Sequence, residues 1–352
     1  MRWYAFLLYP FSLIYDLITR VRNWCFNLGL LKSSPSPIPS LVVGNLSVGG
    51  TGKTPMVEFL IQMLLKEAEV AVLSRGYGRQ TKGFLQATAT SSPAQIGDEP
   101  FQVYKKFGKN VSIYVGEDRV SALEQIALKT NCPEVVILDD AFQHRYLNGD
   151  LKILLTTYQD PFYSDFLLPM GRLRESRGGA ARADVIVVSK SPEDLEEEEK
   201  EIIRQKVSRY ASGGVPVLFS TISYGQPFPL GRNHSFTERL LLLTGLANDT
   251  PLIAYVKKKF TLLEVMSYPD HHDYTMYDFE KIKDVFRQHE KENPVVLTTE
   301  KDAVKVKSNA PTGFLEEIPI FVLPIAVKFA PEDEQTIAQL IQQKVFQKTI
   351  AK

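Results

Sequence analysis

The sequence predicts an α/β protein with two domains and a separate helix at the N-terminus. Short aliphatic runs alternate with helix-period segments along most of the chain, a pattern typical of parallel sheets with right-handed crossovers. A stretch rich in proline and glycine interrupts this alternation near residues 215–230. A chain of 352 residues is long enough for about two cores. We expect an N-terminal helix over 1–32, a first domain over 33–220, a β connection over 221–238 and a second, smaller domain over 239–352.

The strongest local signal is a glycine-rich turn between a strand and a helix. Leu41–Val43 form an apolar run, Met56–Leu65 have helical periodicity, and between them stands G-N-L-S-V-G-G-T-G-K-T-P. This order indicates a P-loop, whose backbone N–H groups surround a polyphosphate. Ser47 occupies a position where the usual pattern has glycine. The first domain is therefore predicted to be P-loop NTPase-like, with ATP and Mg²⁺ as cofactors.

Individual roles within the P-loop follow from its chemistry. Lys53 is expected to reach the β- and γ-phosphates, and the hydroxyl of Thr54 to ligate Mg²⁺. The full set of expected nucleotide-binding residues is Ser47, Val48, Gly49, Gly50, Thr51, Gly52, Lys53 and Thr54.

Carboxylates follow two further elements. The aliphatic run 135–138 ends in Asp139 and Asp140, as in P-loop proteins that present an acid to Mg²⁺. Gly97-Asp98-Glu99-Pro100 opens a helix, and there the two carboxylates are also consistent with simple helix capping. We expect Thr54, Asp140 and Glu99 to be the metal ligands.

Several basic side chains are candidates for contacts with the substrate. Arg75 follows the strand 70–73, where a solvated turn is an equal alternative, and Arg119 precedes a helix. The loop 168–175 carries two arginines that are a plausible clamp for a phosphate. The complete candidate set is Arg75, Arg119, His144, Arg172 and Arg174.

Composition excludes some classes of protein and leaves others open. Lys+Arg and Asp+Glu both number 41, so no overall positive field would attract nucleic acid. Cys25 and Cys132 have no metal-ligand spacing and suggest a reducing compartment. Residues 3–22 combine aromatic and apolar side chains with Arg20 and Arg22, which fits a helix lying in a membrane interface. A helix packed against a core is the alternative.

Seven motifs together resemble one known family, that of the tetraacyldisaccharide 4′-kinases of Gram-negative lipid A synthesis. They occur in the family's order over nearly the whole chain. They are N-L-S-V-G-G-T-G-K-T-P (45–55), S-R-G-Y-G (74–78), G-D-E-P (97–100), L-D-D-A-F-Q-H-R (138–145), L-P-M-G-R-L-R-E (168–175), P-D-H-H (269–272) and T-E-K-D (299–302). Ala141, Arg172 and Asp249 depart from residues that are common in the family.

The resemblance implies an activity and a set of roles. It implies ATP-dependent phosphorylation of the 4′-hydroxyl of a tetraacylated glucosamine disaccharide 1-phosphate, with Asp98 as general base and His271 assisting it. Asp140 would hold Mg²⁺ with Thr54. The lipid substrate and the N-terminal helix would place the enzyme on the cytoplasmic face of the inner membrane.

Two other classes remain as alternatives at this stage. T-E-K-D is similar to the end of a guanine-reading motif, which would suit a regulatory, membrane-associated GTPase or ATPase. Against it, no glycine stands at the third position after Asp139 or Asp140. A membrane-docked module that binds ATP without catalysis would leave Asp98 and His271 without a role. The sequence does not indicate an oligomeric state.

Overall fold

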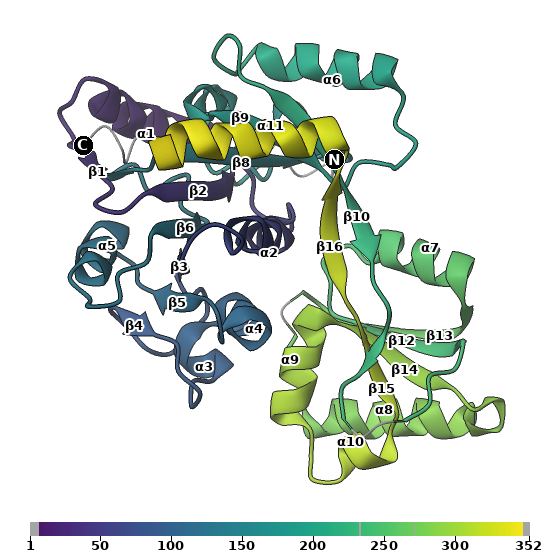
Figure 1. The fold of residues 1–352 in the computed structure, drawn as a ribbon. Helices are drawn as coiled ribbons and strands as arrows, with labels where there is room; N and C mark the ends of the chain where they lie inside the picture. The colour runs from purple at the N-terminus through teal and green to yellow at the C-terminus, as the bar shows by residue number, and fades with distance from the viewer. Residues whose placement is uncertain (1–6, 232–233, 271, 348–352) are drawn as a thin grey trace. The chain divides into compact units, whose positions relative to one another are not determined.

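The structure is a computed structural model that describes residues 7–231, 234–270 and 272–347. The chain divides into two compact units, and each is described by itself. The first unit contains residues up to Ile222 together with the segment from Val327 onward, and the second contains Ser223–Ala326. Figure 1 shows the element labels.

The first unit is built on a nine-stranded sheet with the order β16-β10-β9-β8-β2-β6-β3-β5-β4 in the described residues. The pairs from β10 through to β5 are parallel, and β4 is antiparallel to β5. Its strands are β2 (Ser40–Asn45), β3 (Val70–Ser74), β4 (Leu85–Gln86), β5 (Ser112–Val115), β6 (Val135–Asp139), β8 (Leu151–Thr157), β9 (Val185–Ser189), β10 (Val217–Tyr224) and β16 (Ile325–Phe329). A small separate sheet pairs β1 (Ser34–Pro35) with β7 (Leu147–Asn148).

The helices of this unit connect the strands as crossovers require. They are α1 (Tyr9–Asn27), α2 (Lys53–Leu64), α3 (Pro93–Ile96), α4 (Asp98–Phe107), α5 (Arg119–Ala127), α6 (Glu197–Ser208) and α11 (Pro331–Ile341), with a π-helical turn at Gln342–Phe346 and 3₁₀ turns at Phe162–Ser164 and Arg177–Arg182. The central strands β2, β3, β6 and β9 are buried along their whole length, because helices cover both faces of a parallel sheet. The predicted α/β class with a P-loop-type parallel sheet is confirmed.

The second unit has a five-stranded sheet with the order β11-β15-β14-β12-β13 in the described residues. Its elements are β11 (Phe228–Pro229), β12 (Arg239–Thr244), α7 (Thr250–Lys259), β13 (Thr261–Ser267), α8 (Met276–Gln288), a 3₁₀ turn (Glu290–Glu292), β14 (Val295–Thr299), α9 (Glu300–Asn309), α10 (Phe314–Glu317) and β15 (Ile320–Leu323). Alternate residues of β12 pack into two hydrophobic cores, one on each face of the sheet. Leu241 and Leu243 pack with α8, whereas Leu240 and Leu242 pack with α7.

The division at the C-terminal end differs from the expected boundaries. We expected residues 239–352 to form one domain, but β16 is a neighbour of β10, and α11 belongs to the first unit. Asp333 of α11 accepts a hydrogen bond from the backbone N–H of Phe219 (2.9 Å), and Lys344 pairs with Asp184 at 2.5 Å. Phe329 also packs on Phe59 of α2, with ring centroids 5.0 Å apart. These contacts span more than a hundred residues, so local pattern did not reveal them.

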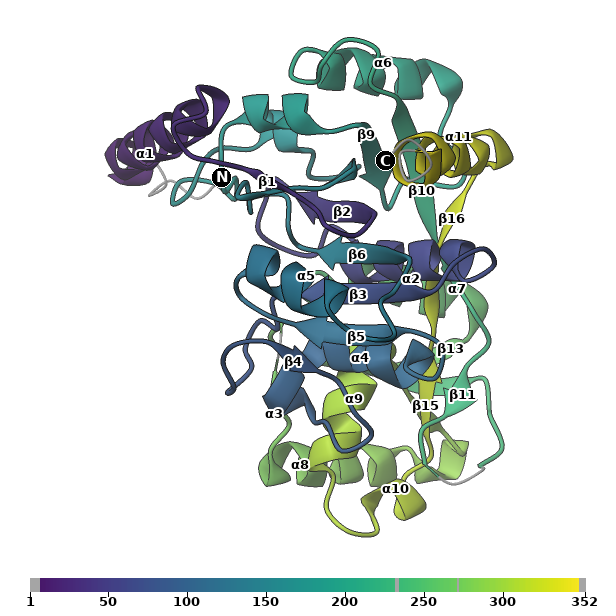
Figure 2. The same ribbon diagram turned by 60° about the vertical axis from the view of Figure 1, so that its left-hand side comes forward.

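Helix α1 lies at the margin of the first unit, beside β1 (Figures 1 and 2). It is attached by polar groups: Ser12 donates to the carbonyl of Leu167 (2.9 Å), and Tyr15 donates to the carbonyl of Arg174 (2.8 Å). Asn23 donates to Glu175 (3.0 Å). No helix in the part of the chain that the structure describes is long and apolar enough to cross a membrane.

Candidate active site

The glycine-rich loop stands where β2 ends, between two parallel neighbours, β6 and β8. Gly49 and Gly52 have φ values of 109° and 83°, which only glycine adopts without strain. Two side chains hold Thr51 in place. Asn45 Nδ2 donates to Thr51 Oγ1 (2.9 Å), and Ser189 Oγ donates to the Thr51 carbonyl (2.8 Å). The loop is therefore shaped by the protein itself, and Lys53 opens α2 directly after it.

Asp140 lies opposite Lys53. Lys53 Nζ is 3.8 Å from Asp140 Oδ1, and Arg174 Nη1 donates to both carboxylate oxygens at 3.0 and 3.1 Å. Asp140 has a φ of 48°, a left-handed conformation that is uncommon for residues other than glycine. Such strain is found most often at functional sites. The structure thus brings together a P-loop lysine, a strand-end carboxylate and an arginine.

Asp139, the last residue of β6, is buried beside these groups. Burial, with the charges of Glu99 and Asp140, raises the pKa of Asp139 to about 7. Its Oδ1 atom is buried and has no hydrogen-bond partner among the described residues. Burying an acid beside two other acids costs free energy, and a nearby cation would reduce that cost.

The donors present fit Mg²⁺, which usually takes one or two carboxylates and completes its octahedron with phosphate oxygens and water. Among the described residues no group of three or more His, Cys, Asp or Glu side chains is arranged to hold a metal by itself. Asp140 and Glu99 supply carboxylates and Thr54 a hydroxyl, which are donor types that Mg²⁺ uses beside phosphate oxygens and water.

The motif at 97–100 meets the motif at 74–78. A Cβ added to Gly97 would lie 3.0 Å from the carbonyl oxygen of Tyr77, so only glycine permits this close approach. Asp98 and Glu99 form the first turn of α4 and are half-buried. The contact explains the glycines at positions 76 and 97, and it places the start of α4 against the loop that follows β3, at the carboxyl edge of the sheet.

Three of the basic candidates for substrate contacts, Arg75, Arg119 and His144, lie near one another. Arg119 is buried, which lowers its pKa, and its Nε lacks a partner among the described residues. Burial and the nearby charge of Arg119 lower the pKa of His144 to about 4. The exposed Arg75 also lowers the pKa of both, so the three groups are close enough to interact.

The two arginines of the loop 168–175 separate. Arg174 holds Asp140, whereas Arg172 pairs with Asp160 (2.9 Å) and with Asp165 (3.0 Å). The backbone of the same loop is attached to the P-loop, since Val48 N donates to the Arg172 carbonyl (2.8 Å) and Arg174 N to the Leu46 carbonyl (2.7 Å).

His271 lies outside the described residues. Its neighbour His272 has an ordinary structural role, with Nε2 3.0 Å from Asp278 Oδ2.

Sequence reasoning missed Lys190, which follows β9. It has a φ of 56°, and a Cβ built on Gly50 would lie 3.8 Å from its Nζ atom, so the amine approaches the P-loop. The available signal was a lysine directly after the buried run V-I-V-V-S. Asn45 and Ser189, which hold Thr51, had no comparable signal.

This fold and this site define a P-loop phosphotransferase. The family model described as tetraacyldisaccharide-1-P 4′-kinase matches residues 4–345. The chain belongs to this family, and it is a kinase.

Curated relatives and a solved structure agree. A tetraacyldisaccharide 4′-kinase of Flavobacterium psychrophilum is 40% identical over 339 residues, covering 95% of each chain. One of Cytophaga hutchinsonii is 39% identical over 346 residues, covering 96% of this chain and 95% of its own. The crystal structure of LpxK from Aquifex aeolicus in complex with ATP has a TM-score of 0.74 and 31% identity, and the match covers 97% of this chain and 99% of that one. The alternative of a regulatory GTPase is not favoured.

Proposed function

We propose that this kinase transfers the γ-phosphoryl group of ATP to the 4′-hydroxyl of a tetraacylated glucosamine disaccharide 1-phosphate. The observation that carries the proposal is the arrangement of Lys53 and Arg174 around Asp140 at the mouth of the P-loop. The names of the relatives supply the substrate. In the transfer, the sugar oxygen forms a bond to the γ-phosphorus, the bond from that phosphorus to the bridging oxygen breaks, and ADP leaves.

The P-loop residues 47–54 bind the phosphates in this proposal. Phosphoryl transfer depends mainly on positioning and on neutralising charge. Lys53 neutralises the β- and γ-phosphates, and Lys190 adds a second cation near Gly50. Mg²⁺, when bound, withdraws charge from the phosphate oxygens. Thr54, Asp140 and Glu99 would hold this ion.

In this proposal Asp98 receives the proton of the attacking hydroxyl, and His271 supports it. Asp98 is the first residue of α4, and a carboxylate is a group that can accept a proton from a hydroxyl. Arg75, Arg119, Arg174 and the neutral His144 are assigned to the substrate side. Arg172, whose charge is already matched by Asp160 and Asp165, contributes mainly to the shape of its loop.

Helix α1 supports a membrane location. Ser12, Tyr15 and Asn23 face the protein and hydrogen-bond to it. The outward side chains Leu13, Ile14, Leu17, Ile18, Val21 and Trp24 are 50–63% exposed. A solvent of lipid would favour this orientation, and water would not. We place the enzyme on the cytoplasmic face of the inner membrane, where ATP is available, with lipid rather than nucleic acid as its partner.

The test is transfer of label from γ-labelled ATP to a tetraacyldisaccharide 1-phosphate by purified protein. Lys53→Ala should abolish transfer while the protein stays folded. Asp98→Ala should lower kcat by about 10² to 10⁴ with little change in ATP binding, because a general base is lost. Adding His271→Ala to Asp98→Ala should cost little more, since the two residues act as a unit.

Three results would contradict parts of the proposal. Near-normal transfer by folded Lys53→Ala would end the kinase mechanism. Weaker ATP binding as the main effect of Asp98→Ala would move Asp98 to the metal site. Multiplying losses in the double variant would show that Asp98 and His271 act independently.

A further inference from the structure

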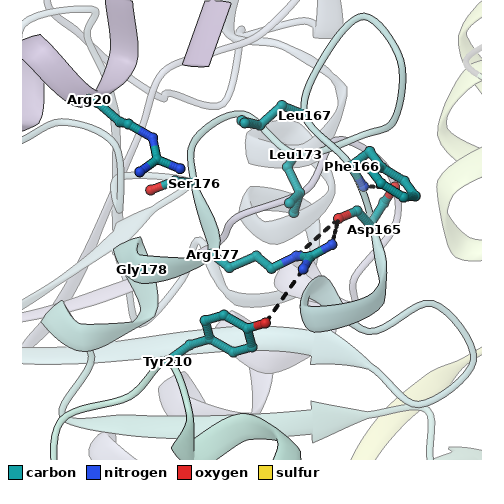
Figure 3. Close-up of a pocket in the computed structure, with 9 residues that line it drawn as sticks. All are labelled: Arg20, Asp165, Phe166, Leu167, Leu173, Ser176, Arg177, Gly178 and Tyr210. Atoms are coloured by element: carbon teal, nitrogen blue, oxygen red, sulfur yellow. Dashed lines mark hydrogen bonds between the residues drawn. The ribbon is translucent and has the colours of Figure 1, made fainter. Parts of the chain in front are cut away.

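A pocket of about 330 Å³ lies beside α1 in the first unit (Figure 3). Arg20 of α1 borders one side, and the segment 165–178 and Tyr210 border the rest. Figure 3 shows Arg177 reaching across the pocket between Asp165 and Tyr210. None of these residues belongs to the proposed nucleotide or metal site.

Arg177 carries a positive charge that no acid of the described residues pairs. Its Nε and Nη2 atoms donate to the backbone carbonyl of Asp165 at 3.2 and 2.8 Å, and Nη1 lies 3.5 Å from the Tyr210 hydroxyl. All three contacts are to neutral oxygens. The guanidinium also lies 5.9 Å from the ring centroids of Phe166 and Tyr210. It is held in place without being neutralised.

The carboxylate of Asp165, at the rim of the pocket, does not neutralise Arg177. Asp165 Oδ2 is 3.0 Å from Arg172 Nε, and Oδ1 accepts from the backbone N–H groups of Phe166 (2.8 Å) and Arg172 (3.3 Å). Within the described residues Arg20 donates through Nε alone, to Asp16 Oδ1 at 2.8 Å, so both of its Nη groups remain as donors there. The pocket therefore offers two guanidinium groups and no uncommitted carboxylate.

The location of Arg20 on α1 connects the pocket to the proposed membrane surface. Leu17 and Ile18 next to it are 63% and 60% exposed, and Val21 is 50% exposed. Tyr15, on the other side, anchors the helix to the protein through the Arg174 carbonyl. Arg20 thus stands at the border between the apolar face and the docked face. At a bilayer surface, that border is the level of the headgroup phosphates.

We propose that this pocket binds the phosphate group of a lipid, through Arg20 and Arg177. A phosphate presents several acceptor oxygens, which match guanidinium donors. The phosphate comes either from a phospholipid of the bilayer or from the 1-phosphate of the substrate. The proposal rests on the membrane location of α1 argued above.

The experiment has two arms and uses the full chain. The first measures sedimentation with vesicles of phosphatidylcholine alone and with vesicles that also contain phosphatidylglycerol. The second measures KM and kcat for the lipid substrate in neutral detergent micelles without phospholipid. Arg20→Gln and Arg177→Gln are compared with Arg287→Gln, which removes the same charge from an exposed side chain of the second unit.

Binding of bilayer phosphate predicts that Arg20→Gln weakens binding to phosphatidylglycerol vesicles about fivefold, the effect of one basic side chain at such a surface. Binding of the substrate's own phosphate predicts instead a rise of about fivefold or more in KM with kcat unchanged. Arg287→Gln should change neither. If Arg177→Gln does not fold, the vesicle binding and KM of Arg20→Gln alone test the proposal.

Unchanged vesicle binding and unchanged KM in Arg20→Gln would overturn the site. A wild-type protein that binds neither kind of vesicle would instead contradict the membrane location, and one that transfers no label would contradict the kinase mechanism. The three failures are therefore distinguishable.

Discussion

Helices α1 and α2 belong to the same unit and have opposite orientations of their apolar side chains. Helix α2 buries Met56, Val57, Leu60, Ile61 and Leu64, which are at most 2% exposed. In α1 the buried residues are Ser12 and Phe26, and most of the large apolar side chains face outward. Both helices are amphipathic, so amphipathicity alone does not say which face meets the protein.

The difference shows how each helix is held. Helix α2 is held by burial of apolar area, which contributes roughly 1.5–3 kcal/mol for each fully buried large side chain. Helix α1 is held mainly by polar contacts. Ser12, Tyr15 and Asn23 make hydrogen bonds worth about 1 kcal/mol net each, and near the C-terminal end the ring of Phe26 is buried against Tyr146. An apolar face left outside a helix that is held mainly by polar contacts is suited to a surface other than water.

The largest effect that tests this comparison is on stability. Leu60→Ala in α2 should lower the free energy of unfolding by about 2–5 kcal/mol, because it leaves a cavity in a packed core. Leu17→Ala, the matched change in α1, should alter it by less than about 0.5 kcal/mol, since Leu17 is 63% exposed. Chemical denaturation measures both, and equal losses would mean that α1 packs like an ordinary core helix.

The second effect concerns binding to membranes. Here the outward side chains of α1, which matter little for stability, should have the large effect. Replacing Leu17, Val21 and Trp24 together by serine should weaken binding to lipid vesicles tenfold or more, about 1.4 kcal/mol, because apolar area that would enter the lipid is lost. Vesicle sedimentation measures the change, with circular dichroism as the control for folding. Unchanged binding would favour the alternative of a helix that only packs on the protein.

The smallest effect concerns pH and the loop on which α1 is docked. Arg22 of α1 donates to the carbonyl of Gln143 at 3.2 Å. Gln143 is the residue directly before His144. Burial lowers the pKa of His144 from 6.5 to about 4. Its neutral form therefore contributes stability that is fully present above pH 6.5 and is lost as the pH falls from 6.5 toward 4.

Allowing for the partial exposure of His144, this contribution is about 1 kcal/mol. His144→Gln should flatten the dependence of unfolding free energy on pH between 6.5 and 4. The substitution Leu60→Ala, which also destabilises the unit, should leave the slope unchanged. An identical slope in His144→Gln and the wild-type protein would show that His144 is not the group responsible.

The sequence by itself determined the features that depend on neighbouring residues. The P-loop is recognised because strand, glycine turn, Lys53 and helix are consecutive, and backbone geometry acts over such short distances. Asp139 and Asp140 follow an aliphatic strand, and parallel strands that flank one another present their ends at one edge. The seven motifs also indicated the family correctly.

The tertiary structure alone decided which side chains meet. Arg172 and Arg174 are two residues apart, yet one pairs with Asp160 and Asp165 and the other with Asp140. The approach of Lys190 to Gly50 and the place of α11 in the first unit depend on strand order. So does the face of α1 that turns outward, because its partners are more than a hundred residues away. Local propensity carries no information about partners that far along the chain, and only packing brings them together.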